Sequence, residues 1–153
     1  MSTTGDLPID VTVAGIPAPQ GSKRHLGNGR LVESSKRVKP WRAAVETATR
    51  ALGRSIPGPV EIGVIFYLPR PLGHYGTGRN AATLRPAAPT WPTSRAHGDL
   101  DKLCRSTLDA LVTGGAIDDD DCVVELSASK LYADTHHAGA TITIRRAPEG
   151  GVA

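Results

Sequence analysis

The sequence has few of the features that mark secreted or membrane proteins. It contains two cysteines, Cys104 and Cys122, among 153 residues, too few for a disulfide framework, so a reducing cytoplasm is the expected compartment. No apolar run approaches the roughly 20 residues that a membrane span needs. The first ten residues lack the charged-then-apolar pattern of a secretion signal. We therefore expect no association with a membrane.

Acidic residues are absent from residues 70–98, which contain Arg70, Arg79, Arg85 and Arg95. This stretch is rich in Pro, Gly, Ala and Thr and shows no hydrophobic periodicity. Loops of this length are usually functional or disordered. Because it ends at Asp99, we interpret it as a flexible basic loop beside a functional site. A passive insertion is the alternative.

Positive charge is also concentrated nearer the N-terminus, although the net charge of the chain is only +3. Residues 20–54 hold nine basic and two acidic residues, a net of +7. A basic surface of this kind suits a phosphate backbone. An unevenly charged but merely solvated surface is the simpler interpretation. The candidate DNA-binding residues are Lys23, Arg24, Arg30, Lys36, Arg42, Arg79, Arg85 and Arg95.

Periodicity predicts a single domain that spans residues 1–153. Alternating apolar residues predict strands near 9–13, 60–68, 122–130 and 140–144, with a short additional strand near 30–33. Apolar residues at three- and four-residue steps predict a helix over about 37–52, with Pro40 in its first turn and Trp41 in the core. A second helix should follow Asp99 and end at Gly114 and Gly115. We expect an α+β (mixed α/β) fold with a central mixed sheet of about four or five strands and two main helices on one face.

Carboxylates are concentrated between Asp99 and Asp121. This range contains seven Asp residues and two basic residues, a net charge of −5. Asp99 and Asp101 open the second helix, and the run from Asp118 to Asp121 precedes a strand that would return beside it. Grouped carboxylates repel one another unless a cation holds them, and their oxygen ligands suit Mg²⁺, with Mn²⁺ as a second choice. Arg105, four residues after Asp101, could stabilise charge that builds on a phosphodiester.

The same stretch resembles the RusA-type Holliday junction resolvases. The matching elements are Asp99-Leu100-Asp101, Arg105, Asp109-Ala110-Leu111, and Asp119-Asp120 ahead of Val123. Gly15-Ile16-Pro17 followed by Lys23-Arg24 matches a further basic loop of the family. The chain departs from the family in having His97-Gly98 in place of a basic pair or Lys-Pro, Lys102 in place of Asn, and Arg105 in place of Lys. Arginine keeps the charge but does not release a proton near neutral pH.

The resemblance implies a Mg²⁺-dependent, structure-specific endodeoxyribonuclease that resolves Holliday junctions in DNA recombination and repair. It implies a homodimer, since a four-way junction is two-fold symmetric. Asp99, Asp101 and Asp120 are the expected catalytic metal ligands, Asp120 because it takes the second place of the family's Asp-Asp pair, and Arg105 is the expected catalytic cation. Asp119 and Asp121 could support or replace Asp120. Lys130 could neutralise these carboxylates or reach water from a strand end.

Two alternatives remain open from the residues alone. The first is a non-catalytic basic DNA-binding module with a metal-stabilised acidic loop, although the aspartate run lacks the glycine and the distal Glu of an EF-hand. The second is a nuclease for flaps, forks or other branched DNA, because phosphate contacts alone carry no information on branching.

Overall fold

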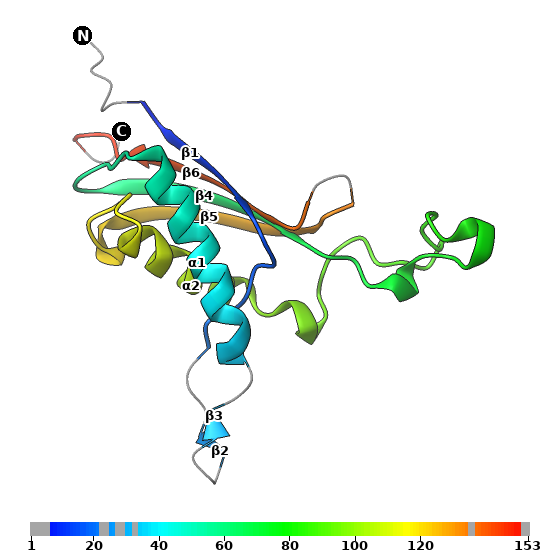
Figure 1. Ribbon diagram of the computed structural model, residues 1–153. Helices are drawn as coiled ribbons and strands as arrows, with labels where there is room; N and C mark the ends of the chain where they lie inside the picture. Colours follow the sequence, from blue (N-terminus) through cyan, green and yellow to red (C-terminus); the bar gives the residue numbers. More distant parts are fainter. Residues whose placement is uncertain (1–6, 22–24, 27–29, 32–33, 135–136, 151–153) are drawn as a thin grey trace.

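A four-stranded mixed sheet forms the centre of the computed structural model, which describes residues 7–21, 25–26, 30–31, 34–134 and 137–150. The sheet order is β1-β6-β4-β5, from β1 (Ile9–Ala14), β6 (Gly139–Arg146), β4 (Val60–Leu68) and β5 (Val123–Tyr132). β4 pairs with β6 antiparallel and with β5 parallel. The predicted α+β fold is therefore confirmed, and β4 is an interior strand, as its apolar pattern indicated (Figure 1).

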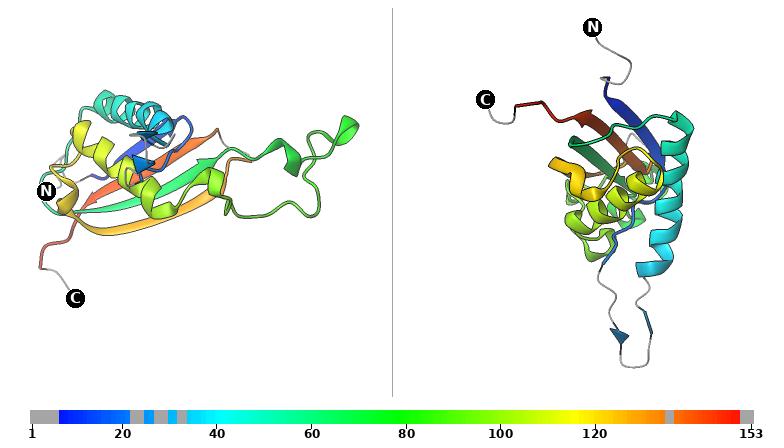
Figure 2. Two further views of the ribbon diagram at one scale, coloured as in Figure 1. Left: turned by 90° about the horizontal axis from the view of Figure 1, so that it is seen from below. Right: turned by 90° about the vertical axis from the view of Figure 1, so that its left-hand side faces the viewer.

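Two helices, α1 (Ser34–Leu52) and α2 (Leu100–Thr113), cover one face of this sheet, as Figure 2 shows. Between helices and sheet lies a core of Val, Ile and Leu side chains around Trp41 and Phe66. Trp41 is 1% exposed, and its indole Nε1 donates to Thr107 Oγ1 of α2 at 3.1 Å. This hydrogen bond satisfies the one polar atom of a large buried ring and ties the two helices together. Trp41 is a core residue, as its position on the apolar stripe predicted.

The start of α1 differs from the prediction. The helix begins at Ser34, three residues before the expected position, so Pro40 lies in its second turn. A proline there removes the N–H that would bond the carbonyl of Lys36. Lys36 and Pro40 are both exposed, where water can serve that carbonyl. The short pair β2 (His25–Leu26) and β3 (Arg30–Leu31) precedes the helix, which partly confirms the predicted strand near 30–33.

The apolar face predicted for β5 is only partly buried. Val124 is 62% and Leu126 is 42% exposed. β5 lies at the edge of the sheet and pairs with β4 alone, so packing covers less of it than of the interior strands. Periodicity within the strand gave its position correctly but not its place in the sheet.

Residues 70–98, called the arm below, leave the end of β4 and project from the body before returning to α2 (Figure 1). The arm contains three 3₁₀ helices, η2 (Leu72–His74), η3 (Gly78–Asn80) and η4 (Arg95–His97), and a bridge between Tyr75 and Leu84. Most of its residues are exposed, including Trp91, which is 58% exposed. The flexibility of this segment stays a prediction.

Candidate active site

The N-terminus of α2 presents two carboxylates to solvent. Asp99 is the N-cap residue, and its side chain makes no capping hydrogen bond. Asp101 lies in the first turn, and both residues are exposed. The positive end of the helix dipole favours their ionised forms. The carboxylate oxygens of Asp99 are therefore not used to cap the helix and can bind a ligand.

The backbone in front of Asp99 is held firmly. Gly98 has φ +81°, and a Cβ atom there would lie 2.5 Å from Cγ of Pro19, so only glycine fits. The carbonyl oxygen of Gly98 accepts a hydrogen bond from Lys130 Nζ at 2.9 Å. Lys130 thus reaches from β5 to the residue that precedes Asp99. Of the two roles considered for Lys130, the structure shows a backbone contact at the site rather than a side chain that only reaches water.

The four consecutive aspartates have different partners. Asp118 Oδ2 accepts from the backbone N–H of Gly58 at 3.0 Å and fixes the loop before β4. Asp119 caps the short helix η5 (Asp120–Cys122) by accepting from the N–H of Asp120 at 2.7 Å. Asp120 and Asp121 are exposed. Two of the four side chains thus serve local structure, which favours Asp120 or Asp121 for an external ligand.

Asp120 lies in a negative environment. A side-chain hydrogen bond with Asp119 is the main cause that raises the pKa of Asp120, followed by a partial loss of solvation and by the charges of Asp119, Asp109 and Asp121. η5 contacts α2, and Asp109 is the α2 carboxylate whose charge acts on Asp120. A cation would relieve this repulsion.

Asp109 has a partner that the sequence did not indicate. Gln20 Nε2 donates to Asp109 Oδ2 at 2.9 Å, and the backbone N–H of Gln20 donates to the carbonyl of Lys102 at 3.0 Å. Residues 20 and 109 are 89 positions apart, so no local pattern could pair them. Gln20 therefore orients the carboxylate of Asp109, whose charge acts on Asp120.

The chemistry of these donors fits a hard cation, because all the candidate ligands are carboxylate oxygens. Within the described residues, however, no three Asp, Glu, His or Cys side chains lie close enough together to form a metal site. The set Asp99, Asp101 and Asp120 stays a prediction, with Asp119 and Asp121 as possible support.

Two basic residues on α2 lie among these acids. Arg105 is exposed one turn after Asp101. Lys102 Nζ lies 3.7 Å from Asp101 Oδ2. A cation on the same helix as the carboxylates can stabilise negative charge on a bound phosphate without competing for the same position. The catalytic role of Arg105 stays a prediction.

The other predicted DNA-binding residues that the structure describes lie on β3, on α1 and on the arm. Lys36, Arg79, Arg85 and Arg95 are exposed, and Arg42 is half-buried. Arg85 also has a structural role, since its Nε donates to the carbonyl of Tyr75 at 2.8 Å within the arm. Lys23, Arg24 and the side chain of Arg30 fall outside the described residues.

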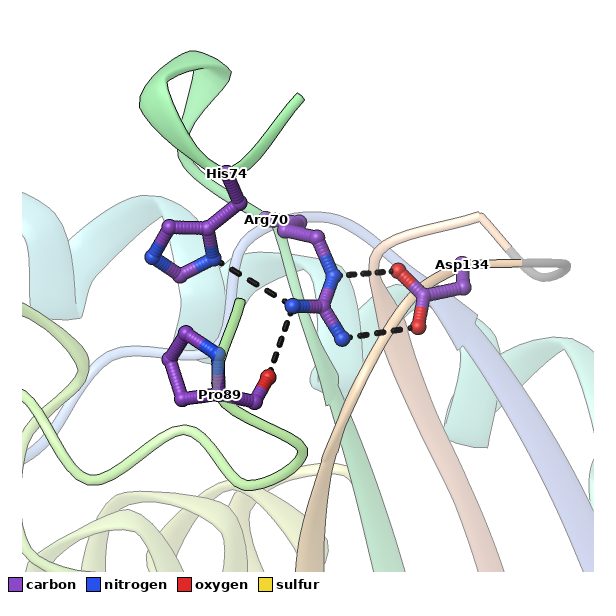
Figure 3. Close-up of polar contacts among 4 residues, drawn as sticks. All are labelled: Arg70, His74, Pro89 and Asp134. Atoms are coloured by element: carbon purple, nitrogen blue, oxygen red, sulfur yellow. Dashed lines mark hydrogen bonds and ion pairs between the residues drawn. The ribbon is translucent and has the colours of Figure 1, made fainter. Parts of the chain in front are cut away.

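Arg70 fastens the base of the arm to the sheet (Figure 3). Arg70 and Asp134 each lie two residues beyond Leu68 and Tyr132, which are paired in the parallel strands β4 and β5. Their side chains form a bidentate ion pair, with Arg70 Nε 2.6 Å and Nη2 3.0 Å from the two carboxylate oxygens. Arg70 Nη1 also donates to the carbonyl of Pro89 at 2.8 Å. The ion pair lowers the pKa of Asp134, chiefly through the hydrogen bond from Arg70.

Tyr132 lies at the centre of this base. The guanidinium carbon of Arg70 is 4.0 Å from the centroid of its ring, and the rings of His74 and His97 meet it edge-on at 5.5 Å and 5.4 Å. His97 is 8% exposed. Burial, and then the charges of Lys130 and His74, lower the pKa of His97. The arm is thus joined to the body directly before Asp99.

Comparison with known proteins identifies a family that covers most of the chain. A family model described as endodeoxyribonuclease RusA matches residues 14–145 of the chain. The matched range contains the acidic residues of α2 and η5, the arm, and all of β4 and β5. No curated protein sequence matches the chain.

Proposed function

The chain belongs to the RusA endodeoxyribonuclease family, and from this membership we propose that it resolves four-way DNA junctions with the help of Mg²⁺, in DNA recombination and repair. As a member of that family it is a hydrolase that acts on DNA, so the non-catalytic binding module is not favoured. The observation that carries the proposal is the pair of exposed carboxylates, Asp99 and Asp101, at the N-terminus of α2, directly after the basic arm.

Asp99, Asp101 and Asp120 would hold the metal ion, which is Mg²⁺ in our proposal, with Mn²⁺ as a substitute. When bound, such an ion lowers the pKa of a coordinated water and neutralises charge on the phosphate. The side chains that would hold it lie on a helix N-terminus and on η5.

The other residues of the site have distinct roles in this proposal. Lys130 and Pro19 hold Gly98, so the position of Asp99 is defined before substrate binds. Arg105 faces the phosphate and stabilises the additional negative charge that develops during hydrolysis. Gln20 orients Asp109 near Asp120.

The substrate in this proposal is branched DNA, bound by a homodimer in the cytoplasm. The exposed cations of the arm and of the first turns of α1 would hold the phosphates of the junction arms. A two-fold symmetric junction needs two cuts, which a C₂ homodimer with two active sites provides. In the described part of the chain no helix is long and apolar enough to cross a membrane.

A substrate panel tests the proposal. Purified protein is incubated with four-way, three-way, flap, fork and linear DNA of matched arm sequences, with either Mg²⁺ or Ca²⁺. We expect paired cuts near the crossover of the four-way junction with Mg²⁺, and none with Ca²⁺, because Ca²⁺ has looser coordination geometry. Equal or faster cutting of flaps or forks would redirect the proposal to another branched substrate. Absence of cutting on every DNA would refute it.

A further inference from the structure

A cavity of about 700 Å³ is lined in part by Ala96 and His97, which shortly precede Asp99 in the chain. Its walls come from the segment after β1, the first half of α1, the end of β4 and the helix η4. We call it the η4 pocket; the residues used below are Ile16, Lys36, Arg37, Trp41, Ala96 and His97. Its size lies within the range typical of small-molecule sites. We propose that the η4 pocket receives an unpaired nucleobase from the DNA strand that is cut, an inference that rests on the proposed function.

The walls of the pocket suit a flat, apolar ring. Four prolines and the indole of Trp41 contribute to the lining. Ile16 also lines the pocket. It lies on a loop and is 61% exposed, so packing of the core does not account for its apolar side chain. Apolar and ring surfaces of this kind bind the faces of bases with little regard to sequence.

One polar group in the wall has no partner. His97 is 8% exposed, and its Nε2 atom is buried without a hydrogen bond among the described residues. A buried polar atom left unpaired is costly, and native structures rarely tolerate one without a reason. A rotation of the imidazole toward the cavity would pair this atom with the edge of a base, as a donor or an acceptor according to the tautomer.

Charge and position together identify a nucleotide rather than another apolar ligand. Lys36 and Arg37 line the pocket and are exposed, and none of the described residues that line it is acidic. A base is attached to a phosphodiester, which these cations would attract. His97 lies two residues before Asp99, so their Cα atoms are at most about 7 Å apart. A base bound against His97 would therefore place a neighbouring phosphate close to the carboxylates of α2.

The point of strand exchange is where such a base would come from. Extruding a base from intact duplex costs its stacking and pairing, and the cost is least where the base is already unpaired. The inference therefore concerns a base at the crossover, and linear duplex should not fill the pocket.

A fluorescent base analogue tests the inference. Four-way junctions carrying 2-aminopurine at the crossover are bound by the wild-type protein with Ca²⁺, and the emission is compared with that of 2-aminopurine placed within an arm. Unstacking increases the emission, so we expect a rise for the crossover position only. Ala96→Leu fills the pocket from an exposed position of η4, and Ala51→Leu, on the exposed end of α1 outside the lining, is the matched control.

Ala96→Leu should lose the rise in emission and bind the junction about tenfold more weakly, the equivalent of one base stack, whereas Ala51→Leu should retain both. Should Ala96→Leu fail to fold, Ile16→Ala removes part of the wall at an exposed residue and should reduce the rise. A protein that cuts unlabelled junctions but shows no rise, or the same rise in Ala96→Leu, overturns the pocket while leaving the nuclease intact. A protein that cuts no branched DNA overturns both.

Discussion

Asp134→Asn should release the arm from the sheet without unfolding the protein. The substitution removes the charge that Arg70 meets through two hydrogen bonds of 2.6 Å and 3.0 Å. Arg70 would be left 4% exposed with the carbonyl of Pro89, His74 Nδ1 and the ring of Tyr132 as remaining contacts. A buried guanidinium that loses its counter-charge is destabilising, because the remaining contacts do not offset the cost of removing its charge from water.

The size of the effect follows from the exposure of the pair. A charge-assisted hydrogen bond contributes about 1.5–3 kcal/mol. Asp134 is 38% exposed, and asparagine keeps one acceptor oxygen, so both bonds together cannot count in full. We expect the closed base of the arm to lose about 2 kcal/mol, which corresponds to roughly a 30-fold shift in its local opening.

Hydrogen–deuterium exchange measures this opening. The amides of His74 and Ala133 bond to the carbonyls of Pro71 and Leu68 at the base of the arm, and their exchange should accelerate by about 30-fold. The melting temperature should barely change, because most of the arm is exposed and lies outside the core. Asp10→Asn, at an exposed residue of β1 bonded to Thr143, is the control. Unchanged exchange, or a large fall in melting temperature, would refute the reasoning.

Three further predictions concern charge. Arg105→Lys should keep appreciable cleavage activity and Arg105→Ala should lose most of it, because charge near the phosphate is the expected contribution; wild-type turnover of the alanine variant would exclude that role. Replacing Arg79 and Arg95 together by alanine should lower the slope of log affinity against log salt by about 0.9 for each phosphate that the protein no longer neutralises, and an unchanged slope would show that the arm does not touch DNA. The Asp134 pKa is lowered from 3.8, so its ion pair should stabilise the arm fully above about pH 5 and be lost as the pH falls below 3.8; pepsin digestion of the arm that does not increase in that range would contradict this.

Local patterns were sufficient to predict the helices and most strands. The three- and four-residue steps of Leu100, Leu103, Thr107 and Leu111 placed α2 correctly, and Gly115, with φ +84°, ends it as glycine can. The RusA resemblance, based on the acidic motif of that helix, was confirmed by the family match. These features depend on residues close together in the chain.

Contacts that depend on the tertiary fold could not be predicted from the sequence. The pairing of Arg70 with Asp134 depends on β4 and β5 being parallel and in register, and the pairing of Gln20 with Asp109 depends on the path of the chain over α2. Neither follows from spacing. The exposure of Val124 and Leu126 likewise depends on β5 being an edge strand, which no pattern within that strand reveals.

Cleavage by two matched aspartate variants tests the central claim most directly. Asp120→Asn removes a proposed metal ligand, whereas Asp118→Asn changes a neighbour whose oxygen bonds Gly58 and whose replacement can still accept that bond. With Mg²⁺ and a four-way junction, Asp120→Asn should bind at least as tightly as the wild type, since negative charge near DNA is lost, but should not cut. Asp118→Asn should bind and cut. Normal cutting by Asp120→Asn would contradict the proposed site.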